Sequence, residues 1–412
     1  MQFYGAGQTT ECYIYASTKN GGRSSLSNTS SVRPFIVAFL AFLLISQIVI
    51  LVSGAPLSLS GKGDFPAFYR AAVIVASGER QNLYDPATQN RFELQIFHDP
   101  QKVPQYFYHP PFEVLLLLPL AFLPYQIAFW CWLAANVVLL LFSARVLSPQ
   151  FRELRRSTGV PISAFCLAFF PVAEALLQGQ DSILLLFVLA LAYRQFCRKQ
   201  DASCGVLLGL GLFKFQHIIP LVAILAFRWR PRLVAAFAAT AIALFGASWA
   251  LVGTPGLISY WHILWHHVPE EVWRMPNIRG LVESLGGSRA IVLILSAGLV
   301  LWFGLRRFRR DTVEFAAAIV AAELVSYHLH MYDLTVLLLP IILALEYAMV
   351  ERKWVGISVV AILFLTPLQP ILWAHRMTYL FSLALLALLI FLSFQDQSQG
   401  TNLFAAGTRK VG

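Results

Sequence analysis

Long apolar runs are the feature that most constrains how this chain can fold. The first run, residues 33–53, and several later ones approach the roughly 20 residues that a helix needs to cross a bilayer core. Backbone groups inside lipid must find hydrogen-bond partners within the segment, so such runs are helical. The period-two alternation of a membrane β-barrel is not visible, and only 13% of the residues are charged. The sequence therefore predicts an all-α polytopic membrane protein.

The expected architecture is a bundle of about 11–13 transmembrane helices with a long first loop that carries amphipathic helices. Several runs are short enough to be tilted, broken or re-entrant. No fixed-length internal repeat is apparent. The candidate spans are residues 33–53, 112–123, 125–147, 160–177, 181–197, 204–226, 231–252, 289–305, 312–327, 331–349, 354–371 and 376–394.

Basic residues gather in short segments between the apolar runs, and this distribution predicts the orientation. Clusters of this kind are typical of cytoplasmic loops, and their dispersal argues against nucleic-acid binding despite a net charge of +10. We expect a multi-pass protein of the cell (inner or plasma) membrane with a cytoplasmic N-terminus. Loops 54–110 and 253–288 and the segment 327–333 then face the extracytoplasmic side. The basic clusters are residues 227–232, 306–310 and 351–353.

Three regions are expected along the chain. Residues 1–32 are rich in Ser, Thr, Gly and Asn and are predicted to form a disordered cytoplasmic tail. Residues 33–394 form the membrane domain, and residues 395–412 a second cytoplasmic tail. The long polar region before the first apolar run favours a retained anchor over a cleaved signal peptide.

One basic segment conflicts with this simple topology. Residues 152–156, with the sequence RELRR, should be cytoplasmic, yet two full crossings at 112–123 and 125–147 would place them outside. A re-entrant pair near Pro119 and Pro124 would remove the conflict, and so would a break of 204–226 at Lys214 into two half-membrane helices. Both alternatives are open, as is the side on which residues 179–181 lie.

The first loop begins with an acid followed by an amphipathic pattern. Apolar residues after Asp64 recur at helical spacing, which predicts a helix lying along the bilayer surface. Asp64 has two interpretations: an N-cap of this helix, or a general base at the membrane boundary, where partial desolvation raises a carboxyl pKa. The two are compatible. The helical face consists of Phe65, Phe68, Tyr69, Ala72 and Ala76.

Charged and polar residues within apolar runs are the other candidates for a site, because charges at membrane depth are costly. Lys214 is either paired with a carboxylate such as Glu174 or Asp181, or it binds an anion. His328 and His330 would diverge on a regular helix, so a hydrogen-bonding or phosphate site is favoured over metal binding. The five cysteines form no CxxC pair, and no disulfide or zinc site is expected.

Five segments taken in order resemble a known family. They read GDFPAFYRAA with LYDP, FYHPPFEVLLLLPLAFLP, QGQD, GLGLFKFQ and SYHLHMYDLTVLLLP, and they extend from about residue 60 to residue 340. Together they resemble glycosyltransferase family 87, which includes the mycobacterial phosphatidylinositol mannoside mannosyltransferases. The resemblance implies a GT-C fold for residues 33–394. Relatives commonly have YPP where this chain has YHPP, so the resemblance supports the family better than it supports individual histidines.

The resemblance also implies an activity and a set of roles. Family members transfer a sugar from a lipid-phosphate donor to an acceptor at the outer face of the membrane. Asp64 matches the catalytic base. Implied donor- or phosphate-binding residues are Lys214, His328, His330, Tyr108 and His109, and implied supporting residues are Gln180, Asp181, Tyr332 and Asp333.

The expected partners are a polyprenyl-phosphate sugar, with mannose favoured, and a lipid or other cell-envelope acceptor. No nucleotide and no obligatory metal are expected, because neither a GxGxxG loop nor a DxD-type element is present. The main alternative is a lipid or saccharide transporter, or flippase, which would also carry charges near the midplane. Such a protein usually has two related halves, and these are not seen.

Overall fold

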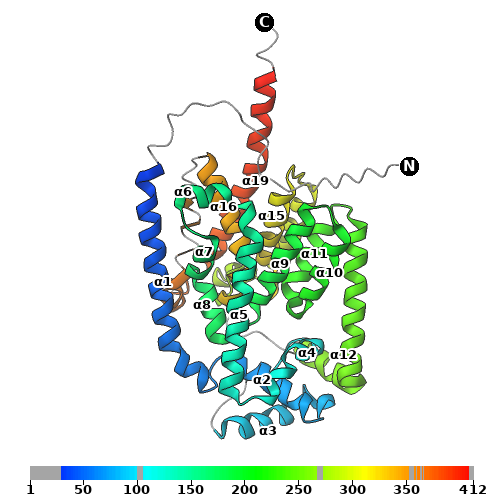
Figure 1. The fold of residues 1–412 in the computed structure, drawn as a ribbon. Helices are drawn as coiled ribbons and strands as arrows, with labels where there is room; N and C mark the ends of the chain where they lie inside the picture. The colour runs from blue at the N-terminus through cyan, green and yellow to red at the C-terminus, as the bar shows by residue number, and fades with distance from the viewer. Residues whose placement is uncertain are drawn as a thin grey trace, which may run out of the picture.

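A computed structural model describes residues 29–99, 105–266, 272–351, 357–358, 360–361, 364 and 366–407. All regular structure within these ranges is helical (Figure 1), and six helices are long and apolar enough to cross a membrane. The prediction of an all-α polytopic membrane protein is therefore confirmed. The expected tail at 1–32 falls largely outside the described ranges. Part of the expected C-terminal tail is helical, since α19 continues to Gly407.

The first half of the chain is a series of short and long helices. They are α1 (Thr29–Leu59), α2 (Phe65–Ala76), η1 (Arg80–Asn82), α3 (Pro86–Phe97), η2 (Pro111–Glu113), α4 (Val114–Leu117), η3 (Leu118–Phe122), α5 (Tyr125–Leu147), η4 (Ser148–Gln150), α6 (Arg152–Thr158), α7 (Ile162–Ala168), α8 (Phe170–Gln178) and α9 (Ser182–Cys197).

In the second half, α12 consists of two helices that meet in a kink at Gly253, whose backbone is not helical. The elements of this half are α10 (Asp201–Leu210), η5 (Gly211–Lys214), α11 (Phe215–Ala226), α12 (Pro231–His266), η6 (Val272–Arg274), α13 (Ile278–Ser284), α14 (Arg289–Leu305), α15 (Asp311–Val325), η7 (Met331–Leu337), α16 (Leu338–Glu351), η8 (Thr366–Leu368), α18 (Gln369–Ala374) and α19 (Tyr379–Gly407).

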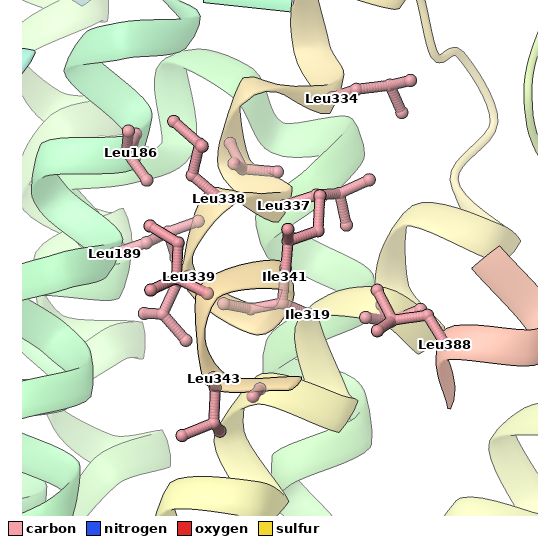
Figure 2. Packing of buried hydrophobic residues seen from close by; sticks show 14 of the residues in the cluster. Leu186, Leu189, Ile319, Leu334, Leu337, Leu338, Leu339, Ile341, Leu343 and Leu388 are labelled. Atoms are coloured by element: carbon pink, nitrogen blue, oxygen red, sulfur yellow. The ribbon is translucent and has the colours of Figure 1, made fainter. Parts of the chain in front are cut away.

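The segment formed by η7 and α16 lies at the centre of the bundle. Nearly all of its side chains are buried, whereas α1 and α12 lie at the edges of the molecule (Figure 1) and present most of their apolar surface outward. Burial of aliphatic side chains on every side of η7 and α16 fixes the depth of the residues at the start of η7. Figure 2 shows this packing, which involves Leu186, Leu189, Ile319, Leu334, Leu337, Leu338, Leu339, Ile341, Leu343 and Leu388.

Two basic clusters meet at one end of the bundle, which we call the basic end. A guanidinium N–H of Arg228 donates to the carbonyl oxygen of Arg306 at 2.7 Å. The side chain of Arg230 lies 3.2 Å from the carboxylate of Asp311. The segments 227–232 and 306–310 are therefore adjacent in space.

The disputed segment RELRR lies at the same end. The carboxylate of Glu346 accepts the backbone N–H groups of Glu153 at 3.0 Å and Leu154 at 2.7 Å. The neighbouring Tyr347 hydroxyl lies 3.2 Å from the hydroxyl of Thr312, one residue from the Asp311 that meets the second basic cluster. The helices α6 and α16 also lie together at the upper end in Figure 1. The cluster 152–156 therefore belongs to the basic end, as the positive-inside rule requires.

The run at 112–123 does not form a crossing helix. It consists of η2, α4 and η3, broken at Pro119 and ended before Pro124, and it lies at the end opposite to the basic end (Figure 1). The Tyr69 hydroxyl donates to the carbonyl oxygen of Leu123 at 2.6 Å, which ties this run to α2. We call this the loop end. With only α5 crossing between them, Pro124 and Arg152 lie at opposite ends, and the topological conflict disappears.

The run at 204–226 is also broken, at the residue that the sequence indicated. Helix α10 ends in the 3-10 turn η5, which contains Lys214, and α11 follows at once. Arg230, just after α11, lies 2.8 Å from Asp201 at the start of α10. Both ends of the segment are therefore at the basic end, and Lys214 lies at the turn inside the bundle.

The first loop is a packed structure with its own apolar core. Helix α2 buries Phe65, Phe68, Tyr69 and Ala72, as the helical spacing predicted, whereas Ala76 is exposed. These side chains pack against α3, α4, η3 and α5, so the apolar face of α2 is covered by protein. That α2 lies along the bilayer surface stays a prediction. Because other helices of the protein pack against α2, they fix the position of its N-terminus, where Asp64 lies.

Candidate active site

Asp64 lies in the turn between α1 and α2. The turn uses Gly61 and Gly63 at positive φ, and the backbone N–H of Asp64 donates to the carbonyl oxygen of Gln178 at 3.1 Å. Asp64 occupies the N-cap position, but its backbone is helical and its side chain forms no capping hydrogen bond. The carboxylate instead accepts a hydrogen bond from Nε2 of Gln180 at 2.6 Å. The helix-cap interpretation therefore predicted the position of Asp64 correctly, but the predicted hydrogen bond from its side chain to the first turn of α2 is absent.

The surroundings of Asp64 favour a proton-accepting role. Burial raises the pKa of its carboxyl, and the hydrogen bond from Gln180 with the nearby His330, Lys214 and His109 offsets only part of that rise. The side chain nevertheless remains partly exposed. A carboxylate that is reachable and has a raised pKa suits a general base.

Lys214 forms the centre of the polar network behind Asp64. Its Nζ lies 2.6 Å from Asp333 Oδ1, 3.0 Å from Asp181 Oδ1 and 3.2 Å from Gln180 Oε1. Ser182 Oγ also donates to Asp333 Oδ1, at 3.0 Å. The ammonium is 2% exposed and lies between two carboxylates, which is the pairing alternative that the sequence left open. A direct phosphate contact by Lys214 stays a prediction.

The histidine segment 328–330 is held in an irregular conformation before η7. The backbone N–H of His330 donates to Asp333 Oδ2 at 3.0 Å, and the backbone N–H of Asp333 donates to the carbonyl oxygen of His330 at 3.1 Å. Burial lowers the pKa of His330, although Asp333 and Asp64 act in the opposite direction. The rings of His328 and Tyr332 pack at 4.3 Å and 5.2 Å from the ring of His330.

A second polar group lies next to Gln180. Nδ1 of His109 is 2.8 Å from Glu113 Oε2 and 3.7 Å from Asp181 Oδ2. Burial lowers the pKa of His109, but the two carboxylates outweigh burial and the net shift is upward. The hydroxyl of Tyr84 donates to the carbonyl oxygen of His109 at 2.6 Å, which anchors the returning loop.

The structure thus brings most of the predicted site residues into one cluster from distant parts of the chain. Asp64 is hydrogen-bonded to Gln180, and Gln180 is hydrogen-bonded to Lys214. Lys214 in turn contacts the carboxylates of Asp181 and Asp333. Tyr108 is placed beside His109 by the chain, with its ring packed edge-on against Tyr106 at 6.3 Å. The roles of these residues stay predictions.

Of four further acids and bases near this cluster, the sequence indicated only Glu174, as a possible partner of Lys214, and none was predicted to be a site residue. Nδ1 of His217 lies 2.7 Å from Glu323 Oε2, and its Nε2 lies 3.7 Å from Asp333. Glu113 contacts His109, and Glu174 is close enough to interact electrostatically with Asp64. All four titratable groups lie inside apolar runs, and that signal could have found them.

The model of glycosyltransferase family 87 matches residues 107–340, which is more than half of the 412 residues. The chain belongs to glycosyltransferase family 87. Together with the six long apolar helices of the described part of the chain, this makes the protein a membrane glycosyltransferase. No curated protein and no solved structure matches the chain.

The family 87 match covers one part of the site and not the other. It includes His109, Gln180, Lys214 and Asp333, but it begins after Asp64. The position of Asp64 beside Gln180 is therefore a structural link between the first loop and the matched region.

Proposed function

We propose that this family 87 protein moves a hexose, with mannose the first candidate, from a polyprenyl-phosphate donor to an acceptor hydroxyl. The acceptor is a lipid or another cell-envelope molecule, and transfer takes place at the extracytoplasmic face. The observation that carries the proposal is the Asp64 carboxylate. It is partly exposed, has a raised pKa, and is held by Gln180 at the junction of a membrane helix and the first loop.

The reaction that fits this geometry is a single displacement. The acceptor oxygen attacks the anomeric carbon while Asp64 takes the proton of the acceptor hydroxyl. The bond between the anomeric carbon and the phosphate oxygen breaks, and its electron pair leaves with the polyprenyl phosphate. Glycosylated acceptor and polyprenyl phosphate are the products, and the anomeric configuration is inverted.

The leaving phosphate needs donors and positive charge as the bond breaks. We assign His330 as one donor, because it lies beside Asp333 at the start of η7 and close enough to Asp64 to interact with it electrostatically. His328 lies beside His330. Lys214 is buried between two carboxylates, so we assign it the role of orienting Gln180 and Asp333 as well as contributing charge.

The membrane setting follows from the donor. A polyprenyl chain stays in the bilayer, so its phosphate is presented near the membrane boundary. Asp64 lies just beyond the end of α1, which is one of the helices able to cross a membrane. An acid at this position meets a lipid-linked donor and an acceptor that approaches from outside.

The test is sugar transfer by the purified full chain in nanodiscs. Polyprenyl-phosphate mannose, polyprenyl-phosphate glucose and a nucleotide sugar are offered separately with an extract of envelope lipids as acceptor. We expect transfer from a polyprenyl-phosphate sugar and none from the nucleotide sugar. Transfer from the nucleotide sugar alone would contradict the proposal, and so would lipid translocation across liposomes without any transfer.

A further inference from the structure

The group formed by His109, Glu113 and Asp181 has the composition and spacing of a cation site. One ligand atom from each residue, an imidazole nitrogen or a carboxylate oxygen, lies within 4.8 Å of the other two. We propose that these three side chains bind a divalent first-row transition cation, Zn²⁺ or Mn²⁺, beside Asp64. This departs from the sequence-based expectation of no obligatory metal, and it concerns binding alone, so it does not depend on the proposed reaction.

Local structure brings the three side chains together. Pro110 is extended and Pro111 begins the 3-10 turn η2, so His109 and Glu113 meet across the turn at 2.8 Å. Asp181 comes from the turn between α8 and α9 and faces His109 with its Oδ2 atom, at 3.7 Å.

Neighbouring residues also hold the ligands in position through hydrogen bonds and ion pairs, as in established metal sites. The Tyr84 hydroxyl holds the backbone carbonyl of His109, and Lys214 holds the other oxygen of Asp181, Oδ1, at 3.0 Å. A carboxylate has enough lone pairs to serve an ammonium with one oxygen and a cation with the other. The three side chains are therefore in place before a cation binds.

The two carboxyl groups of this group are almost completely buried. The side chains of Glu113 and Asp181 are only 3% and 1% exposed. Lys214 contacts Asp181 Oδ1 at 3.0 Å, whereas Oδ2, the oxygen that faces His109, is buried and forms no hydrogen bond of good geometry within the described ranges. A buried carboxylate oxygen without a hydrogen bond is costly. Lys214 is the cation nearest to Asp181 but is shared with Asp333 at 2.6 Å, and His109 is the cation nearest to Glu113.

The ligand types select the class of cation. An imidazole nitrogen suits Zn²⁺ and other transition metals, and Mn²⁺ accepts carboxylates as well, whereas Ca²⁺ and Mg²⁺ prefer oxygen alone. Three protein ligands leave at least one coordination position for water or substrate, as in catalytic zinc sites. His109 is 22% exposed, so the group is open on that side.

The experiment measures cation binding by the full chain, purified in nanodiscs with any affinity tag removed and then treated with a chelator. Zn²⁺ is titrated by calorimetry, Mn²⁺ binding is followed by electron paramagnetic resonance, and metal content is measured after desalting. We expect one cation per chain. Binding should weaken at least about tenfold in Asp181→Asn and in Glu113→Gln.

The control is Glu323→Gln, which alters another buried Glu–His pair. Glu323→Gln should bind the cation as the wild type does. Melting temperatures show that each variant is folded. A wild-type protein that takes up neither cation would overturn the inference, as would equal binding by Asp181→Asn, Glu113→Gln and wild type. Because the readout is metal content, failure here is distinguishable from failure of the transfer reaction.

Discussion

Gln180 is the residue that couples Asp64 to the rest of the site. Its Nε2 donates to the Asp64 carboxylate at 2.6 Å, and its Oε1 lies 3.2 Å from Lys214 Nζ. A hydrogen bond to the ionised form lowers a carboxyl pKa, so this bond keeps Asp64 more available as a base than burial alone would allow.

We therefore expect Gln180→Ala to raise the pKa of Asp64. A base must be ionised to act, so the acidic limb of the pH–rate profile should move to higher pH. The loss of a hydrogen bond to a charged group, about 1.5–3 kcal/mol, predicts a loss of roughly ten- to a hundredfold in kcat/KM at neutral pH. Gln47→Ala is the control, since that buried amide contacts Ala168 on α7. If the acidic limb of the pH–rate profile were unchanged in a folded Gln180→Ala variant, Gln180 would not control the pKa of Asp64.

At the level of elements, the junction of α8 with α2 sets the position of Asp64. Gly179 ends α8 at φ 69°, and its carbonyl accepts the indole N–H of Trp132 at 2.8 Å. A Cβ at this position would lie 2.5 Å from Cβ of Phe65, the residue after Asp64. The two helices approach this closely only because residue 179 has no side chain.

Gly179→Ala should therefore displace α2 as well as strain the backbone. We expect a loss of stability of about 2–4 kcal/mol, from the left-handed backbone and the overpacking together. Gly78→Ala is a matched comparison, because Gly78 also has positive φ and a Cβ there meets nothing within 4 Å. Its cost should be about 1 kcal/mol. Thermal melts of both variants in detergent measure the difference, and equal melting temperatures would contradict the close approach.

Several elements could be predicted from the sequence because their cause is local. The apolar face of α2 was predicted from the helical spacing of its apolar residues. The break at Lys214 was predicted because a helix that faces lipid would not carry this charge. For the run at 112–123 the sequence offered both a full crossing and a re-entrant pair near Pro119 and Pro124, because hydropathy alone does not decide whether a short run crosses. The partners of Lys214 could not be assigned, since Asp333 lies far along the chain and only tertiary packing brings it to 2.6 Å.

For the whole molecule, the separation of the basic end from the loop end predicts the orientation. Arg155 belongs to the basic end and Glu79 to the loop end. Arg155→Cys should react with a membrane-impermeant thiol reagent only after the cell is opened, and Glu79→Cys should react on intact cells. Labelling of the wild-type chain measures the background reaction of its own cysteines with the reagent. The reverse pattern would place the site on the cytoplasmic side and remove the basis for an outer-face reaction.

The measurement that tests the account most directly is sugar transfer by Asp64→Asn, compared with wild type in the same nanodiscs. Asparagine keeps the size of the side chain and cannot accept the acceptor proton. Asp85→Asn is the control, because Asp85 is also a loop carboxylate but caps α3 through Thr88. We predict a loss of about 10²–10⁴-fold in Asp64→Asn and near wild-type transfer in Asp85→Asn. Undiminished transfer by a folded Asp64→Asn would contradict the central claim that this carboxylate is the base.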